Sequence, residues 1–170
     1  SRLRGLVPGH ASSAFSTLSP TTMPFSFPDA YGYCVGAIGA SWFMNFFLSM
    51  QVMSARKKYN VQYPALYADP SHEQAKEFNS VQRAHQNTLE SWAPVSILCL
   101  TNGLAYPVTS AAFYACWVLG RVVYGLGYAK FGPNGRMVGA LLSHLGDFPL
   151  VIMSFATASK MISGGLSLKK

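Results

Sequence analysis

The chain has 170 residues, of which half are hydrophobic and only 11% are charged. Its mean hydropathy of +0.21 is unusual for a soluble domain of this size and favours an integral membrane protein. The net charge of +7 would suit nucleic acid, but the cations are scattered among predicted helix ends and loops. They never form a basic stripe with interleaved exposed aromatic residues, so we do not expect nucleic-acid binding.

The first 28 residues differ in kind from the rest of the chain. They are rich in Ser, Thr and Pro, carry Arg2 and Arg4, and have no acidic residue before Asp29. This composition is typical of a targeting or processing segment. We therefore expect residues 1–28 to be a non-globular N-terminal extension, and a mitochondrial or plastid membrane as the location if it is the remnant of a targeting signal.

Four apolar segments follow the extension. At about 1.5 Å per residue, each is long enough to cross a hydrocarbon core of about 30 Å. The segments cover approximately residues 30–55, 81–104, 108–131 and 137–161. The sequence thus predicts an all-α fold, an integral membrane four-helix bundle over residues 29–163, with a C-terminal tail at 164–170 and both termini on one side of the lipid bilayer.

Positive charge sets the expected orientation of these segments. The first apolar segment has no charge from residue 30 to residue 55, and Arg56, Lys57 and Lys58 follow it directly. Such a cluster marks the inner side of the membrane. The loop at 59–77 and the turn at 130–136 should share that side, because the helices alternate in direction.

Cysteine and histidine give no sign of a disulfide framework or a metal site. The three cysteines, Cys34, Cys99 and Cys116, all fall inside apolar segments, where free cysteine commonly packs as a small apolar side chain. The four histidines, His10, His72, His85 and His144, are too dispersed to suggest shared metal ligation. We expect no metal site.

The second apolar segment opens with polar residues at helical spacing. Arg83, Asn87 and Glu90 stand at i, i+4 and i+7, which places them on one face of a helix. Ionisable side chains at membrane depth cost about 2.5–3.5 kcal/mol each on insertion scales, so a helix carries them mainly toward a bundle interior, a cavity or a ligand. This face is therefore a candidate functional site.

The third segment carries a second polar face. Arg121, Tyr124 and Tyr128 stand at i, i+3 and i+7. Tyrosines at this spacing commonly serve packing or the membrane interface, but a buried guanidinium needs an anionic partner, which Glu90 or a bound ligand would supply. Arg136 follows a tight turn at the start of the fourth segment, where a helix N-terminus favours an anion.

The run QRAHQNTLE, with ARKKY before it and GRVVYGLGY after it, resembles the MAPEG superfamily of integral membrane glutathione enzymes. The similarity is closest to the type 3 microsomal glutathione transferases and covers approximately residues 30–161. It implies a homotrimer of four-helix subunits with three glutathione sites between neighbouring subunits, located in the endoplasmic reticulum.

The same resemblance implies roles for individual residues. In glutathione binding, Arg83 would pair with a carboxylate and Glu90 with the γ-glutamyl ammonium group. Arg136 would stabilise the thiolate of glutathione. The remaining implied glutathione contacts are Asn87 and His85 on the second helix, Arg121, Tyr124 and Tyr128 on the third helix, and Arg56 at the inner end of the first helix. His85 points away from Arg83, so it would serve the site of the adjacent subunit.

Two residues depart from the family pattern. Ser91 stands where the leukotriene-synthase relatives carry a tyrosine, so the shape of the acceptor pocket is expected to differ. Asp147 matches no family site. It would pair with a buried cation, face another protein, or stay neutral in apolar surroundings.

The expected function is conjugation of glutathione to a lipophilic acceptor, or reduction of a lipid hydroperoxide by the same thiolate. The alternative is an accessory structural subunit of a large organellar membrane complex, surrounded by different proteins. The N-terminal extension and Asp147 favour this alternative. The intramembrane charges Arg83, Glu90 and Arg121 disfavour it, because a purely structural subunit has little use for them.

Overall fold

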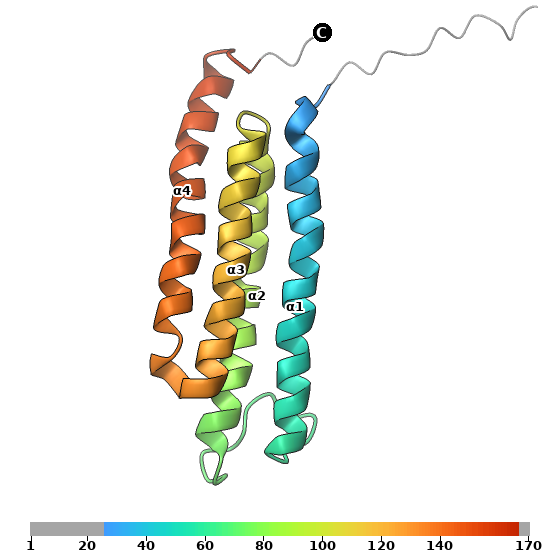
Figure 1. The fold of residues 1–170 in the computed structure, drawn as a ribbon, viewed down its shortest axis with the longest axis vertical. Coiled ribbons are helices and arrows are strands. Elements are labelled where there is room, and N and C mark those ends of the chain that lie inside the picture. The colour runs from blue at the N-terminus through green and yellow to red at the C-terminus, as the bar shows by residue number, and fades with distance from the viewer. Residues whose placement is uncertain (1–25, 167–170) are drawn as a thin grey trace, which may run out of the picture.

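The computed structural model describes residues 26–166 of the chain. Within that range, four long helices pack side by side as a bundle (Figure 1). They are α1 (Gly32–Lys58), α2 (Ala75–Gly103), α3 (Pro107–Phe131) and α4 (Met137–Ile162), with short 3-10 turns η1 (Asp29–Tyr31) and η2 (Gly132–Asn134) before α1 and α4. The predicted all-α four-helix bundle is confirmed, and α1 begins at the end of the bundle where α4 ends. The predicted extension and tail lie largely outside the described residues.

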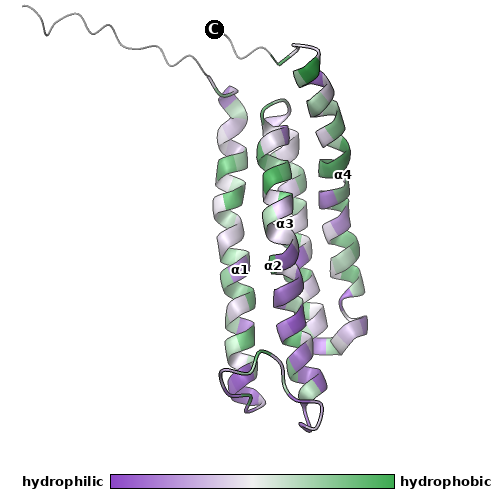
Figure 2. Cartoon of the chain, turned by 180° about the vertical axis from the view of Figure 1, so that it is seen from behind, coloured by the Kyte–Doolittle hydropathy of each residue, from purple (hydrophilic) through white to green (hydrophobic). Residues whose placement is uncertain are grey.

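Composition, rather than length, distinguishes α1 and α4 from α2 and α3. Even α3, with 25 residues, is about 37 Å long, enough to cross a bilayer. Among the described helices, only the stretch Asp29–Lys58 and α4 are also apolar enough to qualify as membrane spans by composition. The prediction of four apolar spans therefore holds for α1 and α4. Figure 2 shows why α2 fails, because hydrophilic residues run along much of its length.

The first helix buries one stripe and exposes the rest. Its buried residues recur every three or four positions, which turns a single face toward α2 and α3. Large apolar side chains project outward instead, among them Trp42, Phe43, Phe46, Phe47, Met50 and Met53. An exposed apolar surface of this extent suits hydrocarbon or another apolar protein surface rather than water.

A buried polar cluster joins the first three helices. The Tyr114 hydroxyl on α3 donates to Oγ of Ser41 on α1 at 2.9 Å, and Nε1 of Trp92 on α2 donates to the same oxygen at 2.8 Å. Ser96 of α2 lies 2.8 Å from the Tyr114 hydroxyl oxygen. These bonds satisfy polar groups in an otherwise apolar core, where an unpaired group would be costly.

Helices α3 and α4 approach each other so closely at several glycines that no larger residue would fit there. A Cβ atom added at Gly120 would lie 2.7 Å from Cα of Ser143, and one at Gly146 would lie 2.6 Å from the backbone nitrogen of Trp117. A Cβ at Gly139 would overlap the backbone of Tyr124. Small residues at such positions let membrane helices pack backbone to backbone. The contacts also fix the register of α4 against α3.

The loop between α1 and α2 is held down by side chains at its base. Arg56, only 8% exposed, donates to the carbonyl oxygens of Val61 (3.4 Å) and Ala65 (2.9 Å). Asn79 of α2 clamps the backbone of Ala68, accepting from its N–H at 2.8 Å and donating to its oxygen at 3.1 Å. These bonds tie the loop to both of the helices that it connects.

Candidate functional site

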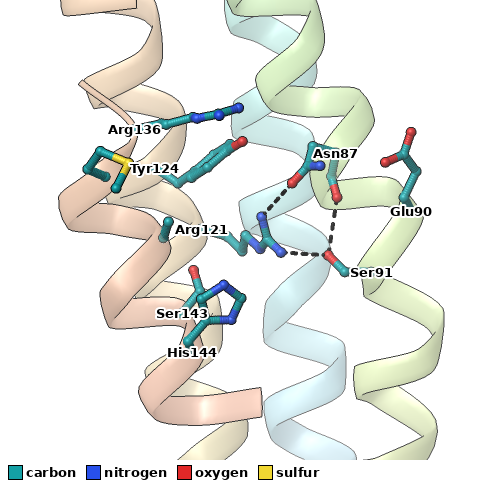
Figure 3. Close-up of a pocket in the computed structure, with 10 residues that line it drawn as sticks. Asn87, Glu90, Ser91, Arg121, Tyr124, Arg136, Ser143 and His144 are labelled. Carbon is teal, nitrogen blue, oxygen red and sulfur yellow. Dashed lines mark hydrogen bonds between the residues drawn. The ribbon is translucent and has the colours of Figure 1, made fainter. Parts of the chain in front are cut away.

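The principal cavity of the described region has a volume of about 470 Å³ and lies between α2, α3 and α4. Figure 3 shows polar side chains converging on it from all three helices. Its lining residues are Asn87, Glu90 and Ser91 of α2, Arg121 and Tyr124 of α3, and Arg136, Met137, Ala140, Ser143 and His144 at and after the start of α4. The two polar faces found in the sequence therefore meet at one cavity.

Arg121 is the most buried charged residue of the cavity, with 6% of its surface exposed. Its guanidinium donates to Oδ1 of Asn87 at 3.0 Å through Nη1 and to Oγ of Ser91 at 2.9 Å through Nη2. The Nε atom is buried without a hydrogen-bond partner. Among residues 26–166, no carboxylate oxygen lies within 4.0 Å of the Arg121 guanidinium nitrogens. An ion pair with Glu90, one of the two anionic partners expected, is therefore absent, and the neutral side chains of Asn87 and Ser91 accept hydrogen bonds from the guanidinium instead.

Glu90 pairs with Arg83 instead. Its Oε1 atom lies 3.1 Å from Nη1 of Arg83, across the two turns of α2 that separate the residues. Both side chains are about half exposed, at 47% and 45%. Glu90 lines the cavity, whereas Arg83 lies outside the lining. Exposed ion pairs of this kind contribute about 0–1 kcal/mol, so the pair is easily exchanged for other partners.

Arg136 stands at a different level of the cavity from Arg121. Its guanidinium carbon lies 5.5 Å from the centre of the Tyr128 ring. Tyr128 follows Arg121 by seven residues, or about 10 Å along α3. The Tyr124 ring lies between these levels, 5.2 Å from the Arg121 guanidinium carbon and 5.7 Å from the Tyr128 ring centre. The cavity thus carries two guanidinium groups on opposite sides of the Tyr124 ring (Figure 3).

Besides Arg83, three predicted site residues do not line this cavity. His85 points toward α1, with Nε2 3.0 Å from Oδ1 of Asn45, on the far side of α2 from Arg83. Arg56 holds the loop after α1, and its guanidinium carbon lies 4.3 Å from the centre of the Tyr63 ring. Tyr128 is buried beneath Arg136 rather than on the cavity wall.

The residues of α4 that line the cavity, apart from Arg136 at its start, were not predicted from the sequence. Ser143 and His144 line the cavity, and Nδ1 of His144 lies 3.1 Å from Oδ1 of Asp147. Asp147 has 14% of its side chain exposed, so it is a partly buried carboxylate hydrogen-bonded to imidazole. A signal was present, because His144 and Asp147 are spaced i, i+3 and His144 follows Arg136 by about two turns.

A family model described as the MAPEG family matches residues 34–156, most of the chain and all four helices. The chain therefore belongs to the MAPEG family of membrane-bound helical bundles, the class that includes glutathione transferases. It is also similar to an uncharacterized protein of Synechocystis sp., sll1147, with 35% identity over 106 residues. That alignment covers 62% of this chain and 72% of the relative.

Proposed function

We propose that this MAPEG protein is a membrane-bound glutathione transferase and peroxidase acting on lipophilic electrophiles or lipid hydroperoxides, closest in kind to the type 3 branch. One observation carries the proposal. Asn87, Glu90, Arg121, Tyr124 and Arg136, from three helices, surround a single cavity whose volume suits a small peptide ligand. An arrangement of two guanidinium groups, a carboxylate and an amide matches a zwitterionic, thiol-bearing tripeptide.

Glutathione would enter at the Arg83–Glu90 pair. The two side chains present opposite charges at the edge of the cavity and are 3.1 Å apart. A ligand with a carboxylate and an ammonium group replaces this one exposed pair with two charge-assisted pairs, which are stronger when water is excluded. The Asn87 amide and the Tyr124 hydroxyl would then orient the peptide within the cavity.

Arg136 would stabilise the thiolate. A thiol with a pKa of about 8.5 is mostly protonated at neutral pH, and an adjacent guanidinium favours the nucleophilic thiolate. Arginine does not act as a base, so its role is electrostatic. In conjugation, sulfur forms a bond to the electrophilic carbon and the leaving group departs. In peroxide reduction, sulfur attacks the distal oxygen, the alkoxide leaves and is protonated to an alcohol, and a second glutathione converts the sulfenic acid to disulfide and water.

The lipophilic acceptor would reach this site from the bilayer, and we propose a homotrimer as the working assembly. Support comes from the wide apolar exteriors of α1 and α4, which offer surface both to lipid and to neighbouring subunits. The endoplasmic reticulum follows from the family resemblance, and a mitochondrial or plastid membrane would follow if residues 1–28 are a targeting remnant.

The test uses the full chain purified in a mild detergent. Calorimetry should detect binding of glutathione, and of S-hexyl glutathione as an unreactive analogue, and the mass of the particle should correspond to three subunits. Turnover should be measured with a small aryl halide and with a lipid hydroperoxide. A monomer that binds neither ligand and turns over neither substrate would contradict the proposal.

The structural-subunit alternative keeps one specific point of support. Arg83 and Glu90 neutralise each other, and Arg121 has two hydrogen-bond partners, so these charged groups have intrachain partners without any ligand. Purification from the native membrane distinguishes the two functions, because this alternative requires stable association with several different proteins and no glutathione binding.

A further inference from the structure

We propose that a groove between the inner ends of α1, α2 and α3 is a binding site for an anionic diacyl phospholipid. The phosphate of the lipid would lie among Lys58, Lys76 and Lys130, and one acyl chain would lie between α1 and α3. None of these lysines lines the cavity that we assign to glutathione, so the inference does not depend on the proposed function.

Two adjoining cavities form the groove. The first has a volume of about 400 Å³ and lies between α1 and α3, with Phe47 and Met50 of α1 in its wall. The second, of about 280 Å³, lies between the start of α2 and the end of α3, with Lys76 and Lys130 in its wall. Ala129 lines both cavities, so they meet at this small side chain.

The first cavity has the length of one leaflet of the bilayer. From Phe47 to Lys58, which both line it, α1 rises about 16 Å, close to half of a hydrocarbon core about 30 Å thick. Toward the membrane centre α1 and α3 close on each other, because a Cβ atom at Gly125 would overlap the Leu48 side chain. One turn later, the small Ala129 leaves room between the helices. The result is a slot for an extended acyl chain.

The wall of this slot changes from apolar to polar along α1. Phe47 and Met50 lie at the deep end and are 37% and 41% exposed. Gln51 and Ser54 follow, and among the described residues neither side chain has a hydrogen-bond partner. A hydroxyl and an amide one to two turns below Lys58 suit the ester carbonyl groups of a glycerolipid, which accept hydrogen bonds and lie just below its phosphate.

Three lysines surround the open end of the groove. Lys58 ends α1, Lys76 lies in the first turn of α2, and Lys130 lies in the last turn of α3. Among residues 26–166, no carboxylate oxygen lies within 4.0 Å of their ammonium nitrogens. Glu77 is the one acidic residue described in either wall, so three positive charges face one negative charge. The groove is therefore complementary to an anion.

The position of these charges favours a phospholipid as the source of the anion. Figure 2 shows hydrophilic residues gathered at the end of the bundle where α1 ends, the end that positive charge assigns to the inner membrane surface. Basic pockets between membrane helices on this side bind anionic head groups. A free phosphate would use the lysines but leave the slot beside Phe47 and Met50 empty, whereas a phospholipid fills both.

The test measures which lipid the full chain retains. The protein in mild detergent is mixed with equal amounts of dioleoyl phosphatidylglycerol and dioleoyl phosphatidylcholine, which share their acyl chains and differ in net charge. Lipids that remain bound after gel filtration are extracted and quantified by mass spectrometry. We expect phosphatidylglycerol to predominate. Lys58→Gln and Lys130→Gln should each lower the ratio of the two lipids about fivefold, the effect of one basic side chain near a membrane surface.

Lys57→Gln is the matched control. Lys57 is an exposed lysine at the same end of α1, but it lines neither cavity of the groove. The control should keep the wild-type ratio. If Lys57→Gln lowers the ratio as much as Lys58→Gln, the preference comes from the overall charge of this surface, and the site is overturned. A ratio that no variant lowers would overturn it as well.

A second comparison tests the slot and the source of the anion. Ala129→Leu narrows the place where the two cavities meet, so it should reduce the bound amount of both lipids. Thermal unfolding checks that each variant is folded, and the exposed lysines decide the outcome if Ala129→Leu is not. Loss of the preference in excess inorganic phosphate would assign the lysines to a free anion. An oligomer that retains neither lipid would assign the groove to a second copy of the chain. Either result would overturn the proposal.

Discussion

Arg83 and Glu90 pair with each other across two turns of α2, with Nη1 and Oε1 3.1 Å apart. These are the two residues that the family resemblance assigns to opposite ends of glutathione. Each side chain is about half exposed, so solvent screens the pair and its contribution to stability is about 0–1 kcal/mol. A pair this weak can open to receive a zwitterion whose charges are complementary to both side chains.

Arg83→Ala and Glu90→Gln should therefore weaken glutathione binding while leaving the fold nearly unaffected. We expect a loss of about 1.5–3 kcal/mol in binding, the usual contribution of a hydrogen bond to a charged group. The change in unfolding free energy should stay below about 1 kcal/mol. Calorimetry and thermal unfolding in detergent measure the two quantities. Glu73→Gln in the preceding loop is the matched control, and unchanged binding in both site variants would make the pair purely structural.

The sequence predicted the parts of the site that lie along one helix. Helical spacing was enough to place Arg83 with Glu90, and Arg121 with Tyr124, because positions i, i+3, i+4 and i+7 share a face in any α-helix. It was also enough to place His85 on the opposite side of α2. Whether His85 and Arg56 contact glutathione in an assembled trimer stays a prediction.

The contacts between helices were not predictable in the same way. The partner of Arg121 was expected to be Glu90 or a bound ligand, and within the chain the register of α2 against α3 brings Asn87 and Ser91, rather than Glu90, within hydrogen-bonding distance. Periodicity says nothing about the height of one helix relative to another. For α3 and α4, that height depends on backbone contacts at glycines, which is why the pairing of His144 with the level of Arg121 was missed.

Tyr124→Phe and Tyr114→Phe should separate binding from stability. The Tyr124 hydroxyl has no hydrogen-bond partner among the described residues, and Figure 3 shows it in the cavity. Its removal should weaken glutathione binding by about 0.5–1.5 kcal/mol and leave stability unchanged. The fully buried Tyr114 hydroxyl bonds Ser41, 2.9 Å away, so its removal should cost about 1–3 kcal/mol of stability. Calorimetry and thermal unfolding of both variants test this, and the opposite pattern would contradict the assignment.

Gly139→Ala should destabilise the bundle and disturb the site together. A Cβ atom at this position would overlap the backbone of Tyr124, so α4 must shift away from α3. Overpacking of this kind costs about 1–3 kcal/mol. Gly39→Ala on α1 is the matched control, because nothing lies within 4 Å of its added Cβ. That substitution should raise the free energy of unfolding by about 0.5–1 kcal/mol, as expected when Ala replaces Gly inside a helix. Equal melting temperatures for the two variants would show that the close contact is not required.

The substitution Arg136→Ala should separate activation of the thiol from binding of the ligand. If the guanidinium stabilises the thiolate, its loss should raise the pKa of bound glutathione toward the free value of about 8.5 and lower turnover at neutral pH. Each unit of pKa regained reduces the thiolate fraction about tenfold below that pKa. Binding of S-hexyl glutathione, which has no thiol, should change much less.

A pH titration of thiolate absorbance in the ultraviolet, recorded with turnover of a small aryl halide, measures this effect directly. Arg136→Ala should recover activity as the pH rises, because hydroxide then supplies the thiolate that the guanidinium no longer favours. Arg136→Lys keeps the charge and should retain part of the pKa depression. If Arg136→Ala leaves the thiol pKa unchanged, Arg136 does not stabilise the thiolate. The remaining cavity guanidinium is that of Arg121, on the other side of the Tyr124 ring, and the same titration of Arg121→Met would then test it.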